Sequence, residues 1–143
     1  MATDRTANVT WHGDLASGGG TIDSVTSGVF SGLGVSWATR SEEPNGQTSP
    51  EELIASAWAS CFSMALSGGL GRAGTPPETL EVSVTVTLQP GEGIIKGAIK
   101  VRGAVPGLDA DGFQAAAEGA KANCPVSKAL AGIPEVTLDA QLA

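Results

Sequence analysis

The chain has 143 residues, of which 41% are hydrophobic and 16% are charged, and its formal net charge is −7. This length suits one domain with a modest core, and this composition excludes an intrinsically disordered chain. Because the chain is acidic and contains no cluster of lysine and arginine, we predict binding neither to nucleic acid nor to an anionic membrane.

The amino-terminal residues, MATDRTANVTWHG, contain no basic segment followed by an apolar one. We therefore predict no signal peptide, and no apolar run reaches the roughly 18 residues that a membrane span needs. We expect a cytoplasmic protein with one domain over residues 1–143. Thiols are kept reduced in the cytoplasm, so a disulfide there is more often catalytic or transient than structural.

The first forty residues are expected to form short strands. Thr6 to Gly13 is rich in β-branched and aromatic residues, and glycines at 18, 19 and 20 mark a turn before a strand from Thr21 to Val29. Leu33 to Arg40 is a third strand candidate. The segment SEEPNGQT that follows is typical of a loop.

The hydrophobic period then changes to that of a helix. Thr48 or Ser49 can cap the helix, Pro50 suits its first position, and two glutamates follow at its positive end. Its apolar face is formed by Ile54, Ala57, Trp58, Cys61, Ala65 and Leu66. Small residues between these positions favour burial, and two glycines at 68 and 69 predict the end of the helix.

The remaining residues predict a hairpin, two helices and a strand. Thr79 to Gln89 alternates with period two, and Ile94 to Val101 is its hairpin partner after a glycine turn. Asp109 to Lys121 and Pro125 to Leu130 are expected to be helices, and Glu135 to Leu142 the last strand. This order predicts an α+β fold without regular βαβ alternation.

The two cysteines are the best candidates for chemistry. Cys61 and Cys124 are 63 positions apart, which excludes a CxxC site, and one histidine without tyrosine leaves few routes other than thiol redox. Cys124 precedes Pro125 at a predicted helix cap, which favours a thiolate, although packing as a small apolar residue is an equally good interpretation. For Cys61 packing is the stronger interpretation, because burial raises the pKa of a thiol unless a cation such as Arg40 or Arg72 reaches it.

Two further patterns carry little information. The glycines at 69, 71 and 74 match G-x-G-x-x-G, but they follow a helix and precede a strand, the reverse of a dinucleotide-binding fold. His12 could in principle join the cysteines at a zinc ion, but three scattered ligands lack any usual spacing. We predict no metal and no cofactor, and we place His12 on the surface or at a sheet edge.

The segments PEELIASAWASCFSMALS and NCPVSKAL, with WHGD, ATR, AVPGLDADGF and VTLDAQL, resemble the OsmC/Ohr family nearly end to end. These are the osmotically inducible and organic-hydroperoxide-resistance thiol peroxidases, and the residues around both cysteines are more similar to the OsmC branch. The resemblance implies an intertwined homodimer in which antiparallel-rich sheets wrap central long helices, in the order βββ-α-ββ-α-α-β.

The resemblance also implies roles for four residues. Cys61 matches the peroxidatic cysteine and Cys124 the resolving cysteine. Arg40 matches the arginine that activates the thiolate, and Glu51 matches the carboxylate that holds this arginine. A guanidinium beside Cys61 can offset the cost of burying a thiolate.

Two residues depart from the family pattern. Trp58 stands where members often carry histidine or tyrosine, and Ser41 follows Arg40 where an aromatic residue is common. Both departures bear on substrate preference. The apolar helix face around Trp58, Phe62 and Leu66 would suit an alkyl or lipid hydroperoxide tail, but it is equally plain core.

Helix geometry adds a prediction about assembly. If Glu51 and Cys61 lie on one helix, ten residues separate them by about 15 Å along its axis. A carboxylate at that distance cannot hold an arginine at this thiol, so it must come from a second, antiparallel copy of the helix. We therefore expect a homodimer with two sites shared between the chains.

The predicted function is reduction of organic hydroperoxides and hydrogen peroxide in oxidative-stress defence. Cys61 becomes a sulfenic acid, Cys124 closes a disulfide, and an external dithiol reopens it. The reductant is a lipoyl protein, thioredoxin or a small thiol. The alternative is a non-enzymatic dimer that senses redox state or binds a small apolar ligand.

Overall fold

The computed structural model describes all residues from 1 to 143, and the chain divides into two compact units, residues 1–53 and 54–143. The element order is βββ-αα-ββ-αα-β, an α+β fold as the sequence predicts. It contains one helix more than predicted, in the first unit. Each unit is described by itself.

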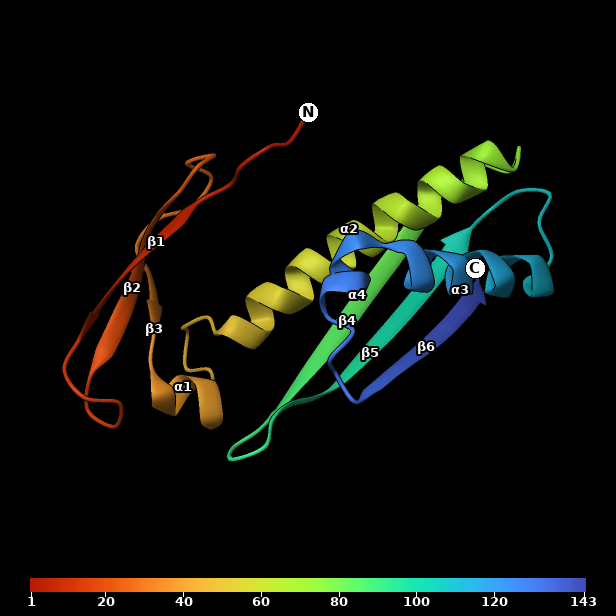
Figure 1. Cartoon of the computed structure of the whole chain (residues 1–143). Coiled ribbons are helices and arrows are strands. Elements are labelled where there is room, and N and C mark those ends of the chain that lie inside the picture. The colour runs from red at the N-terminus through yellow and green to blue at the C-terminus, as the bar shows by residue number, and fades with distance from the viewer. The chain divides into compact units, whose positions relative to one another are not determined.

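The first unit contains a small antiparallel sheet. Its strands are β1 (Ala7–His12), β2 (Gly19–Val25) and β3 (Leu33–Val35), in the order β1-β2-β3 (Figure 1). The pairing of β1 with β2 is interrupted by a bulge between Asn8 and Val9. His12 is exposed at the end of the edge strand β1, which confirms its predicted place.

The third predicted strand, Leu33 to Arg40, is wrong beyond Val35. Ser36 caps a short helix, α1 (Trp37–Ser41), and its hydroxyl accepts a hydrogen bond from the Thr39 N–H at 3.2 Å. The Ser36 side chain thus pairs the Thr39 N–H within the helix, whereas in a strand this N–H would need an acceptor on a neighbouring strand. The chain therefore turns into a helix, and Arg40 lies in its last turn.

The long helix α2 (Pro50–Arg72) begins where predicted but is longer at its carboxyl end. The Ser49 hydroxyl accepts a hydrogen bond from the Glu52 N–H at 3.2 Å, which makes Ser49 the cap. The prediction that the glycines at 68 and 69 end the helix is wrong. The helix continues so that Leu70 is buried at 1% exposure, and Gly74, at φ +86°, lies just beyond its end.

By length and composition alone α2 could cross a membrane, so the prediction that no segment is long enough does not hold. The packed central helix of a protein outside membranes passes the same test. One face of α2 is covered in the second unit, where Trp58, Phe62, Leu66 and Leu70 are at most 1% exposed.

The second unit is built on a sheet of three strands, with β5 in the middle. The strands are β4 (Thr79–Gln89), β5 (Gly93–Ala104) and β6 (Glu135–Leu142). β4 and β5 form the predicted antiparallel hairpin, whereas β6 runs parallel to β5, a pairing that the sequence did not indicate. Such a parallel return needs a crossover, which the helices after β5 supply.

The helices α2, α3 (Ala110–Asn123) and α4 (Pro125–Ala129) cover one face of this sheet (Figure 1). The Asp109 carboxylate accepts a hydrogen bond from the Gly112 N–H at 2.8 Å and caps α3. The core beneath the helices consists of Trp58, Phe62, Leu66, Leu70, Ile99, Val101, Val105, Phe113, Ala117, Ala120 and Cys124. A reactive-cysteine candidate is thus part of the core itself.

The Trp58 indole packs directly against the backbone of Gly97 in β5. A Cβ added at Gly97 would lie 2.6 Å from the Cη2 atom of Trp58, closer than such atoms approach in proteins. We expect Gly97→Ala to lower the free energy of unfolding by about 1 to 3 kcal/mol, measured by chemical denaturation. Gly119→Ala on α3 is the matched control, because nothing lies within 4 Å of its added Cβ. Equal stability of the two variants would contradict the tight contact.

Candidate functional site

The two cysteines meet in the core of the second unit. Cys61 lies on α2 and Cys124 is the residue between α3 and α4, and both are free thiols. Their sulfur atoms are 2.7 Å apart and share a hydrogen bond. Cys61 is partly exposed, whereas Cys124 is fully buried. An S–S bond of about 2.05 Å would need the two sulfur atoms to approach by only about 0.7 Å.

The surroundings of the two thiols move their pKa values in opposite directions. Burial, and then the hydrogen bond with Cys124, raise the pKa of the Cys61 thiol. Burial opposes ionisation of Cys124 as well, but hydrogen bonds from Cys61, from the N–H and hydroxyl of Ser127 and from the Val126 N–H outweigh it, so the pKa of Cys124 is lowered.

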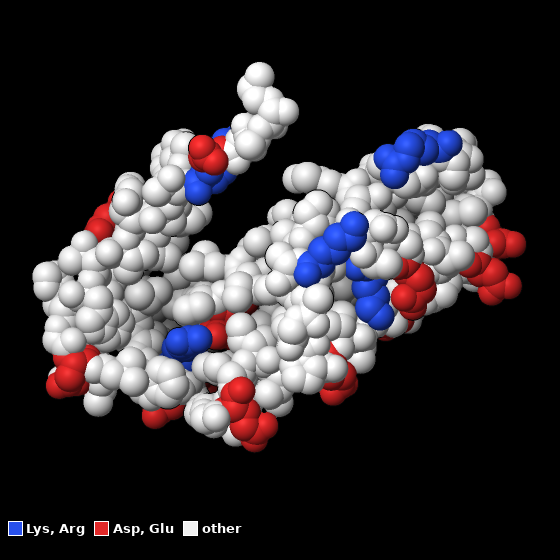
Figure 2. Space-filling view, in the orientation of Figure 1, with Lys and Arg blue, Asp and Glu red and all other residues white.

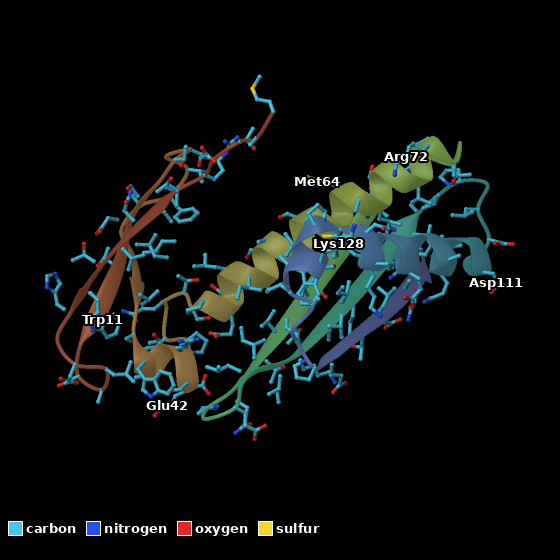
Figure 3. All side chains as sticks on the ribbon, in the orientation of Figure 1. Trp11, Glu42, Met64, Arg72, Asp111 and Lys128 are labelled. Carbon is cyan, nitrogen blue, oxygen red and sulfur yellow. The ribbon has the colours of Figure 1, made fainter.

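No cationic side chain of residues 54–143 is among the groups that act on Cys61. Arg72, one of the two basic residues considered for this role, lies at the far end of α2, with its Nη1 atom next to Gly68 (Figure 3). Within residues 54–143, burial of the Cys61 thiol is therefore not offset by a positive charge.

The first unit holds the other two predicted site residues as an ion pair. Arg40 donates from Nη2 to Glu51 Oε1 at 2.8 Å and from Nε to both carboxylate oxygens at 3.2 Å. Glu51 is 7% exposed, and the hydrogen bond with Glu51 raises the pKa of Arg40. The Arg40 guanidinium also lies 6.0 Å from the centre of the Trp37 ring. Such a held guanidinium presents its remaining N–H groups in a fixed direction.

Trp58 is buried in the core of the second unit and forms a hydrogen bond there. The Trp58 indole N–H donates a hydrogen bond to the Ser127 hydroxyl at 2.7 Å, and the ring is 1% exposed. Together with the buried Phe62 and Leu66 it forms core in this unit, the plainer of the two predicted interpretations. Sequence reasoning missed Ser127, although its place three residues after a predicted helix cap could have indicated it.

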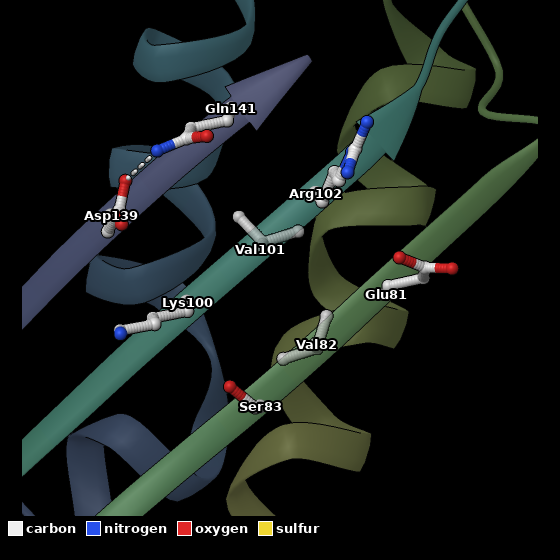
Figure 4. Close-up of a pocket in the computed structure, with 8 residues that line it drawn as sticks. All are labelled: Glu81, Val82, Ser83, Lys100, Val101, Arg102, Asp139 and Gln141. Atoms are coloured by element: carbon white, nitrogen blue, oxygen red, sulfur yellow. Dashed lines mark hydrogen bonds between the residues drawn. The ribbon is translucent and has the colours of Figure 1, made fainter. Parts of the chain in front are cut away.

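Two surface hollows of the second unit lie apart from the thiols. One, of about 340 Å³, is on the outer face of the sheet, where Glu81 is opposite Arg102 and Lys100 opposite Asp139 (Figure 4). These alternating charges are typical of a solvated sheet face. The other, of about 350 Å³, is lined by Trp58, Glu118, Lys121, Ala122, Ser127, Lys128, Leu130, Ala131 and Val136.

Charged side chains are scattered over the face drawn in Figure 2, without a continuous basic patch. Across the chain, no group of three or more histidine, cysteine, aspartate or glutamate side chains is placed to hold a metal ion. The chemistry that the chain offers is therefore concentrated in a thiol pair and a guanidinium–carboxylate pair.

Comparison with known proteins agrees with this arrangement. The family model described as OsmC-like protein matches residues 43–139. The chain is 43% identical over 145 residues to Peroxiredoxin OsmC of Escherichia coli (strain K12), a match that covers 99% of both chains.

Solved structures show the same fold. The organic hydroperoxide resistance protein OhrB of Bacillus subtilis is similar at a TM-score of 0.62 and 26% identity, over 96% of this chain and 98% of that one. The OsmC-like protein of unknown function from Vibrio cholerae has a TM-score of 0.71 and 15% identity, over 97% and 99% of the two chains. On its sequence and its fold, this chain belongs to the OsmC family and to its OsmC branch.

Proposed function

We propose that the chain is a cysteine-based peroxidase that reduces organic hydroperoxides and hydrogen peroxide in oxidative-stress defence. The observation that carries the proposal is the 2.7 Å separation of two free thiols that are 63 positions apart in the sequence. A peroxidase-type function is also supported by the names of the relatives, Peroxiredoxin OsmC and an organic hydroperoxide resistance protein.

The proposed reaction begins at Cys61, the more exposed thiol. Its thiolate attacks one oxygen of the peroxide, and the O–O bond breaks. The other oxygen leaves as an alkoxide or hydroxide, which takes up a proton. Cys61 becomes a sulfenic acid. The Cys124 thiolate then attacks the Cys61 sulfur, hydroxide leaves as water, and a disulfide forms. Two electrons have passed from the thiol pair to the peroxide.

Activation of Cys61 requires a positive charge, because its pKa is raised within its own unit. We propose that Arg40 provides this charge and stabilises the peroxide oxygens, while Glu51 holds Arg40 through the three hydrogen bonds described above. Because Glu51 already holds the Arg40 guanidinium, its remaining N–H groups can bind the peroxide without a further loss of side-chain entropy.

We infer further that the site is shared between two copies of the chain. Glu51 and Cys61 are ten residues apart in α2, a rise of about 15 Å in any α-helix. Because Glu51 is bonded to Arg40 of its own chain, the pair would serve Cys61 of the partner chain. A homodimer with two equivalent sites satisfies this condition.

An external dithiol completes the cycle by thiol–disulfide exchange, and we propose a lipoyl protein, thioredoxin or a small thiol for this role. Such reductants are found in the cytoplasm, where we place the protein. The full-length similarity to Peroxiredoxin OsmC supports treating residues 1–143 as one OsmC-like domain, although they form two compact units.

The test of this function is turnover. With excess dithiothreitol, we expect the protein to consume many equivalents of tert-butyl hydroperoxide, measured as peroxide remaining over time. A redox sensor would consume one equivalent per site and stop, and a ligand-binding dimer would consume none. Either of these results would overturn the proposal, and the rate ratio between tert-butyl hydroperoxide and hydrogen peroxide would define the preferred substrate.

A further inference from the structure

We propose that the hydrogen bond between Trp58 and Ser127 positions Cys124 for disulfide formation with Cys61. The bond fastens α4, the short helix that begins directly after Cys124, to the long helix α2. The inference deepens the proposed function, because it rests on the step in which the two cysteines form a disulfide. Trp58 and Ser127 are positioning residues in this step, since they act through the placement of Cys124.

Two side-chain contacts join α2 to the segment around Cys124. The Trp58 indole nitrogen lies 2.7 Å from the Ser127 hydroxyl oxygen, and the two thiol sulfur atoms are also 2.7 Å apart. Trp58 precedes Cys61 by three positions, and Ser127 follows Cys124 by three positions. Three residues correspond to a rise of about 4.5 Å in a helix, so the two contacts are neighbours on both segments.

Trp58 is the fixed partner in this hydrogen bond. Its side chain is 1% exposed, and its ring lies against the backbone of Gly97, where no room remains for an added Cβ. An indole nitrogen is a donor only, so it donates to a lone pair of the Ser127 hydroxyl oxygen. The packing of Trp58 on the sheet therefore determines where its acceptor on α4 must lie.

The helix α4 has little else to hold it. It has only five residues, none of them buried, and a helix of this length is not stable by itself. Val126 and Leu130 are partly buried against the core. Cys124 lies between α3 and α4 with a non-helical backbone, at φ −56° and ψ 125°. The place of its side chain therefore depends on how α4 is held against α2.

The hydrogen bond then bears on the equilibrium between dithiol and disulfide. The sulfur atoms need to approach by only about 0.7 Å to form the bond, provided that α4 stays in place. In reduced molecules whose α4 has moved away, Cys124 is not available to Cys61. The equilibrium constant for disulfide formation is therefore multiplied by the fraction of reduced molecules in which α4 is held. Once formed, the disulfide holds α4 itself.

The first experiment measures the reduction potential of this disulfide. Wild type and Ser127→Ala are oxidised with diamide and equilibrated with mixtures of reduced and oxidised dithiothreitol. Free thiols are then counted by N-ethylmaleimide labelling and mass spectrometry. In this exchange the protein disulfide takes two electrons and two protons from dithiothreitol, which becomes a cyclic disulfide. We expect Ser127→Ala to lower the equilibrium constant for disulfide formation at least about threefold, a potential less negative by about 14 mV.

Two further variants control this measurement. Ser127→Thr keeps the hydroxyl and should restore the wild-type potential, whereas Ser83→Ala, on the exposed outer face of the sheet, should leave it unchanged. An unchanged potential in Ser127→Ala, or a shift that Ser127→Thr does not reverse, would overturn the inference. Diamide forms the disulfide without peroxide, so failure of this proposal and failure of the proposed peroxidase function are distinguishable.

The second experiment tests whether Ser127 acts through Trp58. Trp58→Phe keeps an aromatic ring in the core and removes the indole N–H. In this background Ser127→Ala is expected to change the equilibrium constant by less than about 1.5-fold, because the hydroxyl has already lost its donor. The same measurement in dithiothreitol mixtures is used. A full threefold effect of Ser127→Ala in the Trp58→Phe background would overturn the role of Trp58.

Discussion

Cys61→Ser is expected to abolish peroxide consumption, with a fall in rate of about a thousandfold or more for tert-butyl hydroperoxide under excess dithiothreitol. A serine hydroxyl at this position has almost the shape of the thiol but cannot be oxidised to a sulfenic acid. The substitution leaves the Cys124 thiol in place, so any remaining turnover reports what Cys124 can do alone. Peroxide loss over time is the measurement.

Cys124→Ser is the matched comparison, because it removes the second thiol and keeps the first. We expect this variant to form one equivalent of sulfenic acid on Cys61, trapped by dimedone and located by mass spectrometry, and then to stop forming the disulfide. The reverse result, in which Cys61→Ser is still oxidised and Cys124→Ser is not, would exchange the two roles. This comparison is necessary because the pKa of Cys124 is lowered, which makes Cys124 a candidate nucleophile as well.

Local patterns in the sequence were sufficient for much of the fold. The strand from Thr79 to Gln89 has the predicted bounds, because exposed and half-buried residues alternate from Thr79 to Val86. Ser49, one of the two predicted caps, also caps α2. In each case the residues that determine the structure lie within a few positions of one another.

The predictions from sequence were wrong where distant or competing interactions determine the secondary structure. Leu33 to Arg40 has the composition of a strand, but Ser36 offers its backbone a capping bond and α1 forms instead. Gly68 and Gly69 are poor helix formers, yet burial of Leu70 outweighs their cost, which is about 1 kcal/mol for each glycine. The parallel pairing of β5 with β6 depends on the crossover between them, which a strand pattern does not encode.

The candidate site shows the same division between local and distant information. The resemblance to the family indicated Cys61, Cys124, Arg40 and Glu51, and the structure brings them together as two pairs. The bond between Trp58 and Ser127 joins residues 69 positions apart, and no local pattern reveals it. Family membership alone did not reveal it either, because Trp58 departs from the family pattern.

Mixing two inactive variants is expected to restore activity, since the proposed site takes Cys61 from one chain and Arg40 from the other. Arg40→Ala removes the charge that would favour the Cys61 thiolate, and Cys61→Ser removes the nucleophile, so each variant alone should lose at least about a hundredfold in rate. After unfolding and refolding together, half of the dimers contain one chain of each kind, and each of these has one complete site of two. We therefore expect about a quarter of the wild-type rate. The control is the same mixture prepared without unfolding, and failure to recover activity after verified exchange would place both residues in one chain.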